Sequence, residues 1–124
     1  MTDAKPTTPP SPRVKRCPGA IAALNDAFRA SLGPALGRIL MTSGVAALPA
    51  DIRQDIIRGV RSFREFSTDN DAHGEHDFGA FDCRGERIFC TLDYYDPAME
   101  YGANDPADPT KTLRVLTIML ADEY

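Results

Sequence analysis

Two segments in the first half of the chain repeat apolar residues with the period of an α-helix. The first segment begins at Pro18-Gly19 and ends at Gly33-Pro34, and the second begins at Pro49. One stripe is formed by Ile21, Leu24, Phe28 and Leu32, and the other by Ile52, Ile56, Val60 and Phe63. Each stripe lies on one face of its helix, so both helices are predicted to cover a core.

Strand patterns occupy most of the remaining chain. Gly37 to Thr42 is a short apolar segment, and the turn residues Thr42-Ser43-Gly44 follow it. After Phe66 the apolar residues alternate with a period of two, over 77–83 and 87–95, on either side of Arg84-Gly85. The two segments form a predicted hairpin, with Phe81 facing Ile88 and Asp82 facing Arg87. Residues 113–120 are apolar on both faces, which is typical of a central strand covered on both sides.

This order of elements predicts an α+β domain in which two helices pack on one face of a mostly antiparallel sheet of about four strands. We expect residues 18–124 to form this single domain. Residues 1–17 are rich in proline and poor in large apolar side chains, so they are predicted to be a disordered tail. The tail carries a short basic group, Arg13, Lys15 and Arg16.

The composition of the chain argues against a membrane-spanning, secreted or disulfide-bonded protein. The chain has 124 residues, and no apolar run approaches the ~20 residues that cross a bilayer. The N-terminus lacks the apolar segment of a signal peptide, so a cytoplasmic protein without a membrane partner is expected. The three cysteines show no Cys-x-x-Cys spacing, which favours reduced thiols. Cys83 and Cys90 are interpreted as small core residues.

The net charge of −4 is unevenly distributed along the chain. Residues 1–68 contain ten Lys and Arg against five Asp and Glu, whereas residues 69–124 contain four against thirteen. Such asymmetry indicates a charged partner surface if the acidic half gathers on one side of the fold. If the two halves interleave in space, their charges cancel.

The tightest group of titratable residues lies just before the hairpin and contains both histidines. The hairpin partner ends in a second acidic group, and an antiparallel pair brings these two ends together at one edge of the sheet, beside the long connection over 96–111. We expect the functional surface there. The candidate binding residues are Asp69, Asp71, His73, Glu75, His76, Asp77, Asp93, Tyr95, Asp96, Asp105 and Asp108.

Three interpretations of this group stay open. Imidazole and carboxylate side chains suit a divalent transition metal, so His73, His76, Asp77 and Asp93, with Asp96, are the alternative metal ligands of a hydrolase or nuclease. An EF-hand is rejected, because Ala80 stands where a bidentate glutamate is required. In the structural interpretation, the Asp and Asn side chains form Asx-turns and His76 bonds a carboxylate to fix the loop. In the third, the acidic surface binds a partner without catalysis and without a cofactor.

Six blocks of the sequence resemble a family of small bacterial proteins of unknown function that is frequent on plasmids, integrative elements and phages. The blocks are 24–26, 41–45, 74–79, 93–97, 105–109 and 114–124. The resemblance spans about Ile21 to Tyr124 and implies mobile-element biology, but it supplies no catalytic residues.

A non-enzymatic interaction protein is therefore favoured over an enzyme. Its expected partner is a host protein or nucleoprotein complex, such as a CRISPR effector or a restriction nuclease, because an acidic surface can occupy a basic nucleic-acid channel. A DNA-binding accessory protein that uses the tail and Arg53, Arg58, Arg61 and Arg64 is a third hypothesis. Direct nucleic-acid binding is not favoured, since acidic residues dilute this stripe.

Overall fold

A computed structural model describes residues 17–124 of the chain, so residues 1–16 of the predicted tail over 1–17 lie outside the described residues. Apart from the short helix α2 and the 3₁₀ helix η1, the helices and strands follow the predicted order. They are α1 (Pro18–Ser31), β1 (Gly37–Met41), α2 (Ser43–Ala46), α3 (Ala50–Ser62), β2 (Phe78–Cys83), β3 (Glu86–Tyr95), β4 (Leu113–Leu120) and the 3₁₀ helix η1 (Ala121–Glu123). No helix in this part of the chain is both long enough and apolar enough to span a membrane.

The four strands form one mixed sheet in the order β1-β4-β3-β2. Strand β1 runs parallel to β4, and the other two pairings are antiparallel. The hairpin register is confirmed, because Phe81 pairs with Ile88 and Asp82 with Arg87. Arg84 and Gly85 both have positive φ, at 53° and 86°, as a two-residue turn of this kind requires. Strand β4 is central, and both of its faces carry buried residues.

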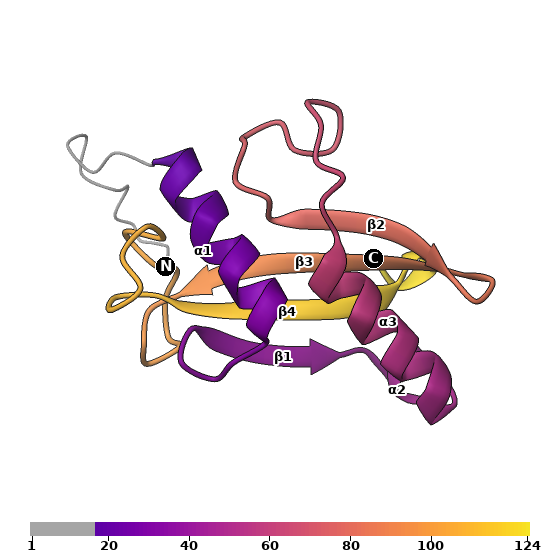
Figure 1. Ribbon diagram of the computed structural model, residues 1–124. Coiled ribbons are helices and arrows are strands. Elements are labelled where there is room, and N and C mark those ends of the chain that lie inside the picture. The colour runs from indigo at the N-terminus through magenta and orange to yellow at the C-terminus, as the bar shows by residue number, and fades with distance from the viewer. Residues whose placement is uncertain (1–16) are drawn as a thin grey trace.

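Helices α1 and α3 lie side by side on one face of the sheet (Figure 1). The core between these layers confirms the predicted stripe of the second helix, since Ile56 and Val60 are fully buried. It consists of Phe28, Val45, Ile56, Val60, Ile88, Cys90, Leu92, Leu116 and Ile118. The α+β architecture is therefore the predicted one.

Helix α1 buries Ile21 and Phe28 of its predicted apolar stripe, but its buried face is shifted to include polar residues. Asn25 and Arg29 are among its buried residues, whereas Leu24 is half-buried. Asn25 has no exposed surface, and Arg29 is 3% exposed. The helix is rotated towards these polar side chains because both find partners in the sheet and in the loop before β2.

The predicted turn at residues 42–44 is instead the start of a short third helix, α2. The C-terminal Glu123 explains this difference, because its carboxylate accepts hydrogen bonds from the Gly44 backbone N–H at 3.0 Å and from the Thr42 hydroxyl at 2.6 Å. A carboxylate at this position satisfies a backbone donor that the helix itself leaves without a partner. Val45 is then fully buried beneath the helix.

Candidate functional site

An open pocket of about 570 Å³ lies where β3 extends beyond the start of β2. Strand β2 begins at Phe78, opposite Thr91, so the last residues of β3 face a loop rather than a strand. The pocket is lined by His73, Glu75, Asp77, Leu92, Asp93, Tyr94 and Tyr95. The loop before the hairpin and the end of its partner strand therefore contribute to one site, as the sequence predicted.

The long connection after β3 turns back along the same strand. Tyr95 forms an isolated antiparallel bridge with Gly102, and the Ala103 N–H donates to the Tyr94 carbonyl at 3.1 Å. This return is stabilised by Asp96, whose carboxylate accepts the N–H groups of Glu100 and Tyr101. The expected position of this loop beside the two acidic ends is confirmed, and Asp96 closes a turn.

Burial raises the pKa of two carboxyl groups in the pocket. For Asp77, burial is the largest cause; the neighbouring Glu75 and Asp71 raise the pKa further, while a backbone hydrogen bond and His73 lower it. For Asp93, the partial burial of the carboxyl is the cause, although the residue as a whole is exposed. Within residues 17–124 neither carboxylate forms a salt bridge with lysine or arginine. A cation in the pocket would therefore stabilise both ionised forms.

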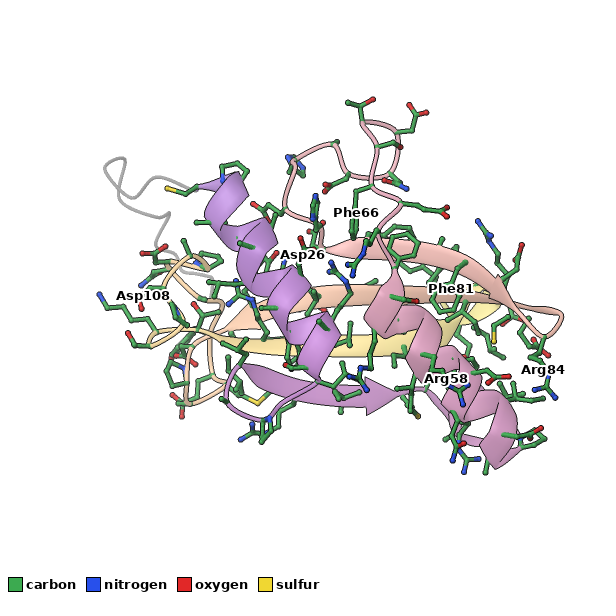
Figure 2. All side chains as sticks on the ribbon, viewed as in Figure 1. Asp26, Arg58, Phe66, Phe81, Arg84 and Asp108 are labelled. Atoms are coloured by element: carbon green, nitrogen blue, oxygen red, sulfur yellow. The ribbon has the colours of Figure 1, made fainter. Side chains whose placement is uncertain are left out.

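The acidic loop keeps its shape through Asp71 and His76. The Asp71 carboxylate accepts the backbone N–H groups of Glu75 at 3.1 Å and His76 at 3.0 Å. His76 has a φ of 57°, its Nδ1 lies 2.9 Å from Asp26, and its ring stacks on Phe66 at 3.9 Å. Figure 2 shows Asp26 and Phe66 between α1 and this loop. The structural interpretation is confirmed for these two residues.

A buried polar network holds the back of the pocket. The Asn25 amide donates to the Glu75 carbonyl and to the Tyr94 hydroxyl, both at 2.9 Å. Its oxygen accepts Arg114 Nε at 2.7 Å, and the Tyr94 hydroxyl donates to the Glu75 carboxylate at 3.2 Å. Arg114 is fully buried, donates to the Pro106 carbonyl and lies 5.3 Å from the Tyr94 ring centroid. Two walls of the pocket are thus bonded to α1 and β4.

Sequence reasoning missed this network. The strand patterns over 87–95 and 113–120 do not distinguish Tyr94 or Arg114 from their apolar neighbours. The available signal was the presence of Asn25, Arg29 and Arg114 within apolar segments. A buried polar residue requires a partner, and such residues indicate an internal network rather than a solvent-facing side.

Arg29 anchors the same loop from α1. It pairs with Asp26, donates to the His76 carbonyl at 2.8 Å and lies 4.8 Å from the Phe66 ring centroid. The Asp26, Arg29, Phe66 and His76 side chains therefore form one packed group. This group explains how a loop with few apolar residues keeps a defined conformation.

The alternative metal ligands do not converge on one point. His73, Asp77 and Asp93 line the pocket, whereas His76 lies against Asp26 and Asp71. Among residues 17–124, no three His, Cys, Asp or Glu side chains are arranged to hold a metal ion. The hydrolase alternative has no ligand set in this arrangement.

The remaining candidates lie apart from the pocket. Asp105 and Asp108 each accept a backbone N–H two residues further along the chain, from Ala107 and Thr110, which is the geometry of Asx-turns. Asp69 is exposed on the loop before β2. Of the predicted set, the structure therefore brings together His73, Glu75, Asp77, Asp93 and Tyr95.

The predicted basic stripe on α3 is occupied by internal contacts. Arg53 donates to the Ala46 and Leu48 carbonyls, Arg58 pairs with Asp55, and Arg61 Nε donates to the Ala30 carbonyl at 2.9 Å. Arg53 and Arg61 thus connect α3 to neighbouring segments, whereas the Arg58 pair lies within the helix.

The cysteines in the sheet behave as core residues. Cys90 is 2% exposed, and burial raises its pKa to about 11. Burial also raises the pKa of the half-buried Cys83. Both thiols are protonated near neutral pH, which does not suit a nucleophile.

The chain matches the model of the family described as "Protein of unknown function (DUF3768)" over residues 41–123. The chain belongs to this family. The DUF3768 match contains every residue that lines the pocket, and α1 with Asn25, Asp26 and Arg29 precedes it. The expected membership of an uncharacterised family is confirmed. No curated protein and no solved structure matches the chain.

Proposed function

We propose that this protein acts by binding a positively charged segment of a partner protein in the pocket at the end of β3. The observation that carries the proposal is the presence of Asp77 and Asp93 in one open pocket without a lysine or arginine salt bridge from residues 17–124. An arginine side chain satisfies carboxylates through several donors at once. It also stacks on aromatic rings such as that of Tyr95.

The pocket suits binding better than catalysis. Glu75 and Tyr94 are held in a hydrogen-bond network, and no three His, Cys, Asp or Glu side chains of the described part of the chain are arranged to hold a metal ion. A pocket wall that is held by hydrogen bonds before binding lowers the conformational cost of receiving a cation. The protein is thus a non-enzymatic binding protein in this proposal.

A defined peptide tests the proposal. The probe is a fluorescent eight-residue peptide of alternating arginine and serine, titrated by anisotropy against the wild type and against an Asp77→Asn, Asp93→Asn variant. We expect the variant to bind at least about tenfold more weakly, because two charge-assisted contacts are lost. Binding by the wild type should also weaken as sodium chloride is raised.

A matched control removes the same charge elsewhere. Asp82 and Glu100 are exposed and do not line the pocket, so an Asp82→Asn, Glu100→Gln variant has the same net charge as the pocket variant. It should bind the peptide like the wild type. Equal weakening in both variants would show that net charge, rather than the pocket, attracts the peptide, and the proposal would be abandoned.

The most specific form of the proposal concerns the partner. The acidic second half of the chain and the resemblance to mobile-element proteins support an inhibitor of a host defence nuclease, of the anti-CRISPR or anti-restriction type. Such a nuclease carries a basic channel for nucleic acid, which the acidic pocket would engage. The test is phage plaque formation on cells with an active CRISPR or restriction system. Wild-type expression should protect the phage and the pocket variant should not, whereas no protection by the wild type would remove this form of the proposal.

A further inference from the structure

Strand β1 forms one edge of the sheet, and its outer side is open. Among residues 17–124 only β4 pairs with it, and no strand lies beyond it (Figure 1). The bonds to β4 use every second residue, from the Leu36 carbonyl to the Thr42 N–H, and both of these end bonds measure 3.1 Å. The residues in between therefore point their backbone N–H and C=O groups away from the sheet. These residues are Gly37, Ile39 and Met41.

The side chains of β1 do not protect this edge. Proteins commonly guard an open edge with charged residues, proline or a bulge. The β1 sequence is Gly-Arg-Ile-Leu-Met, and its exposed apolar residues Ile39 and Leu40 are 37% and 53% exposed. The opposite edge, β2, carries Asp82, and Glu65 and Asn70 of the preceding loop line a hollow beside it. Of the two edges, β1 is thus the one suited to pair with a further strand.

A second copy of β1 in antiparallel orientation fits the edge by symmetry. When Ile39 of both copies lies on a two-fold axis, Gly37 of each copy faces Met41 of the other. The outward groups of all three residues then bond one another, which gives about six backbone hydrogen bonds. Leu40 of each copy lies on the opposite face of the strand from Met41 and becomes a diagonal neighbour of its own counterpart.

Two charges next to this edge have no opposite charge to pair with inside the described part of the chain. The Arg38 guanidinium donates to backbone carbonyls and forms no salt bridge within residues 17–124. Glu123 caps α2 and accepts the Thr42 hydroxyl at 2.6 Å, but within the same residues it pairs with no cation.

The antiparallel register brings these two charges together. Arg38 becomes a diagonal neighbour of Thr42 of the second copy, and diagonal neighbours lie about 7–8 Å apart, within reach of a long side chain. The right-handed twist of paired strands shortens this diagonal and lengthens the one between the two Arg38 residues. Arg38 of each copy can therefore reach the Glu123 carboxylate beside Thr42 of the other, which gives the interface charge complementarity.

We propose that the protein forms a symmetric dimer in which β1 pairs antiparallel with β1 of a second copy, so that two four-stranded sheets become one. The inference goes beyond the proposed function, since no residue of β1 lines the pocket. A single strand pair buries less than the standard interface of about 1,600 Å². We therefore expect a weak dimer, with a dissociation constant of about 1–100 μM.

Sedimentation equilibrium of the full-length chain is the first test. Between about 1 and 500 μM, which brackets the expected dissociation constant, the wild-type mass should rise from 13.6 kDa towards twice that value. Ile39→Pro should stay monomeric, because it removes an outward N–H that β4 does not use. A wild type that stays monomeric would overturn the proposal and leave the edge to a strand of another protein. A dimer that survives Ile39→Pro, or species larger than a dimer, would also overturn it.

A pair of charge variants tests the register in the same measurement. Arg38→Glu should weaken the dimer at least about tenfold, because it places a carboxylate beside Glu123 of the second copy. Arg87→Glu is the matched control: it makes the same change of charge on an exposed residue of β3 and should dimerise like the wild type. Equal weakening by both variants would overturn this register.

Disulfide trapping decides the matter even if Ile39→Pro fails to fold. The background is Cys17→Ser, because Cys17 is the exposed cysteine of residues 17–124. Ile39→Cys places two thiols on the axis with Cα atoms about 5.5 Å apart, a separation that a disulfide spans. Ser43→Cys, also exposed, would be more than about 20 Å from its counterpart. Under mild oxidation Ile39→Cys should form a covalent dimer at least about tenfold faster than Ser43→Cys, and equal rates would overturn the proposal.

Discussion

Two groups of carboxylates lie at opposite ends of the molecule and differ in how their charge is balanced. At the turn of the β2–β3 hairpin, Arg84 bonds Asp51 at 3.1 Å and Asp55 at 2.8 Å, and Arg58 also pairs with Asp55. Figure 2 shows Arg58 and Arg84 at this end and Asp26 and Asp108 towards the other. At the pocket, within residues 17–124, Asp77 and Asp93 have no such arginine.

The pKa directions follow the same division. The hydrogen bonds from Arg84 and Arg58 lower the pKa of Asp55, whereas burial raises the pKa of Asp77 and of Asp93. The first group is a solvated ion-pair cluster that fastens α3 to the hairpin. The second group consists of Asp77 and Asp93, which lie in a partly buried pocket supported by the hydrogen-bond network of Asn25, Tyr94 and Arg114. The two groups therefore differ in whether arginine balances their charge, and the proposed binding site is the group that has no arginine salt bridge within residues 17–124.

The largest effect is expected from Asn25→Ala, which removes the support of the pocket. The substitution removes the acceptor of Arg114 Nε and the amide group that donates to the Tyr94 hydroxyl and the Glu75 carbonyl. We expect a loss of about 3 kcal/mol in the free energy of unfolding, measured by urea denaturation. Ala23→Ser on the exposed side of α1 is the control and should change it by less than about 0.5 kcal/mol. A loss as small as that of the control would show that the network does not stabilise this end.

A smaller effect is expected in the pH dependence of stability. The pKa values of Asp77 and Asp93 are raised in the folded state, so the folded protein binds protons more tightly than the unfolded chain does. The free energy of unfolding therefore falls as pH rises from the ordinary aspartate pKa of about 3.9 through the folded value. The Asp77→Asn, Asp93→Asn variant should therefore match the wild type near pH 3 and be more stable near pH 7, by less than about 1 kcal/mol because both groups retain contact with solvent.

The Asp55→Asn variant is expected to change the pH dependence of the free energy of unfolding in the opposite direction. The pKa of Asp55 is lowered in the folded state, so its contribution is present above the ordinary aspartate pKa and is lost as pH falls through the folded value. This variant should be less stable than the wild type near pH 7 and equal to it at low pH. The same sign for both variants would contradict the division between the two clusters.

The smallest effect is expected from Arg84→Ala. It removes two exposed ion pairs, and such pairs contribute little because water and salt screen them. Thermal unfolding should show a slight decrease in Tm that disappears in 1 M sodium chloride, a salt level at which the screening length is about 3 Å. Binding of the arginine–serine peptide should be unchanged. A large decrease in Tm that persists in 1 M sodium chloride would mean that these ion pairs stabilise the fold as much as the buried network behind the pocket does.

Local patterns in the sequence determined most of the fold. The period of two around Arg84-Gly85 gave the hairpin with its register, and the doubly apolar segment 113–120 gave the central strand, because burial imposes these patterns directly on the side chains. The approach of the two acidic ends also followed from the hairpin alone. Helix α2 could not be foreseen, since the Glu123 carboxylate that supports it lies at the other end of the chain.

Only the tertiary structure decided which acidic residues belong to the pocket. His76 and Glu75 are neighbours in the sequence, yet His76 turns to Asp26 and Phe66 while Glu75 lines the pocket. The choice depends on Asn25, Arg29 and Arg114, which are far away in the sequence and become neighbours of this loop only when α1 packs on the sheet. Burial and long-range hydrogen bonds have no local signature, and these interactions convert an acidic stretch into a shaped site.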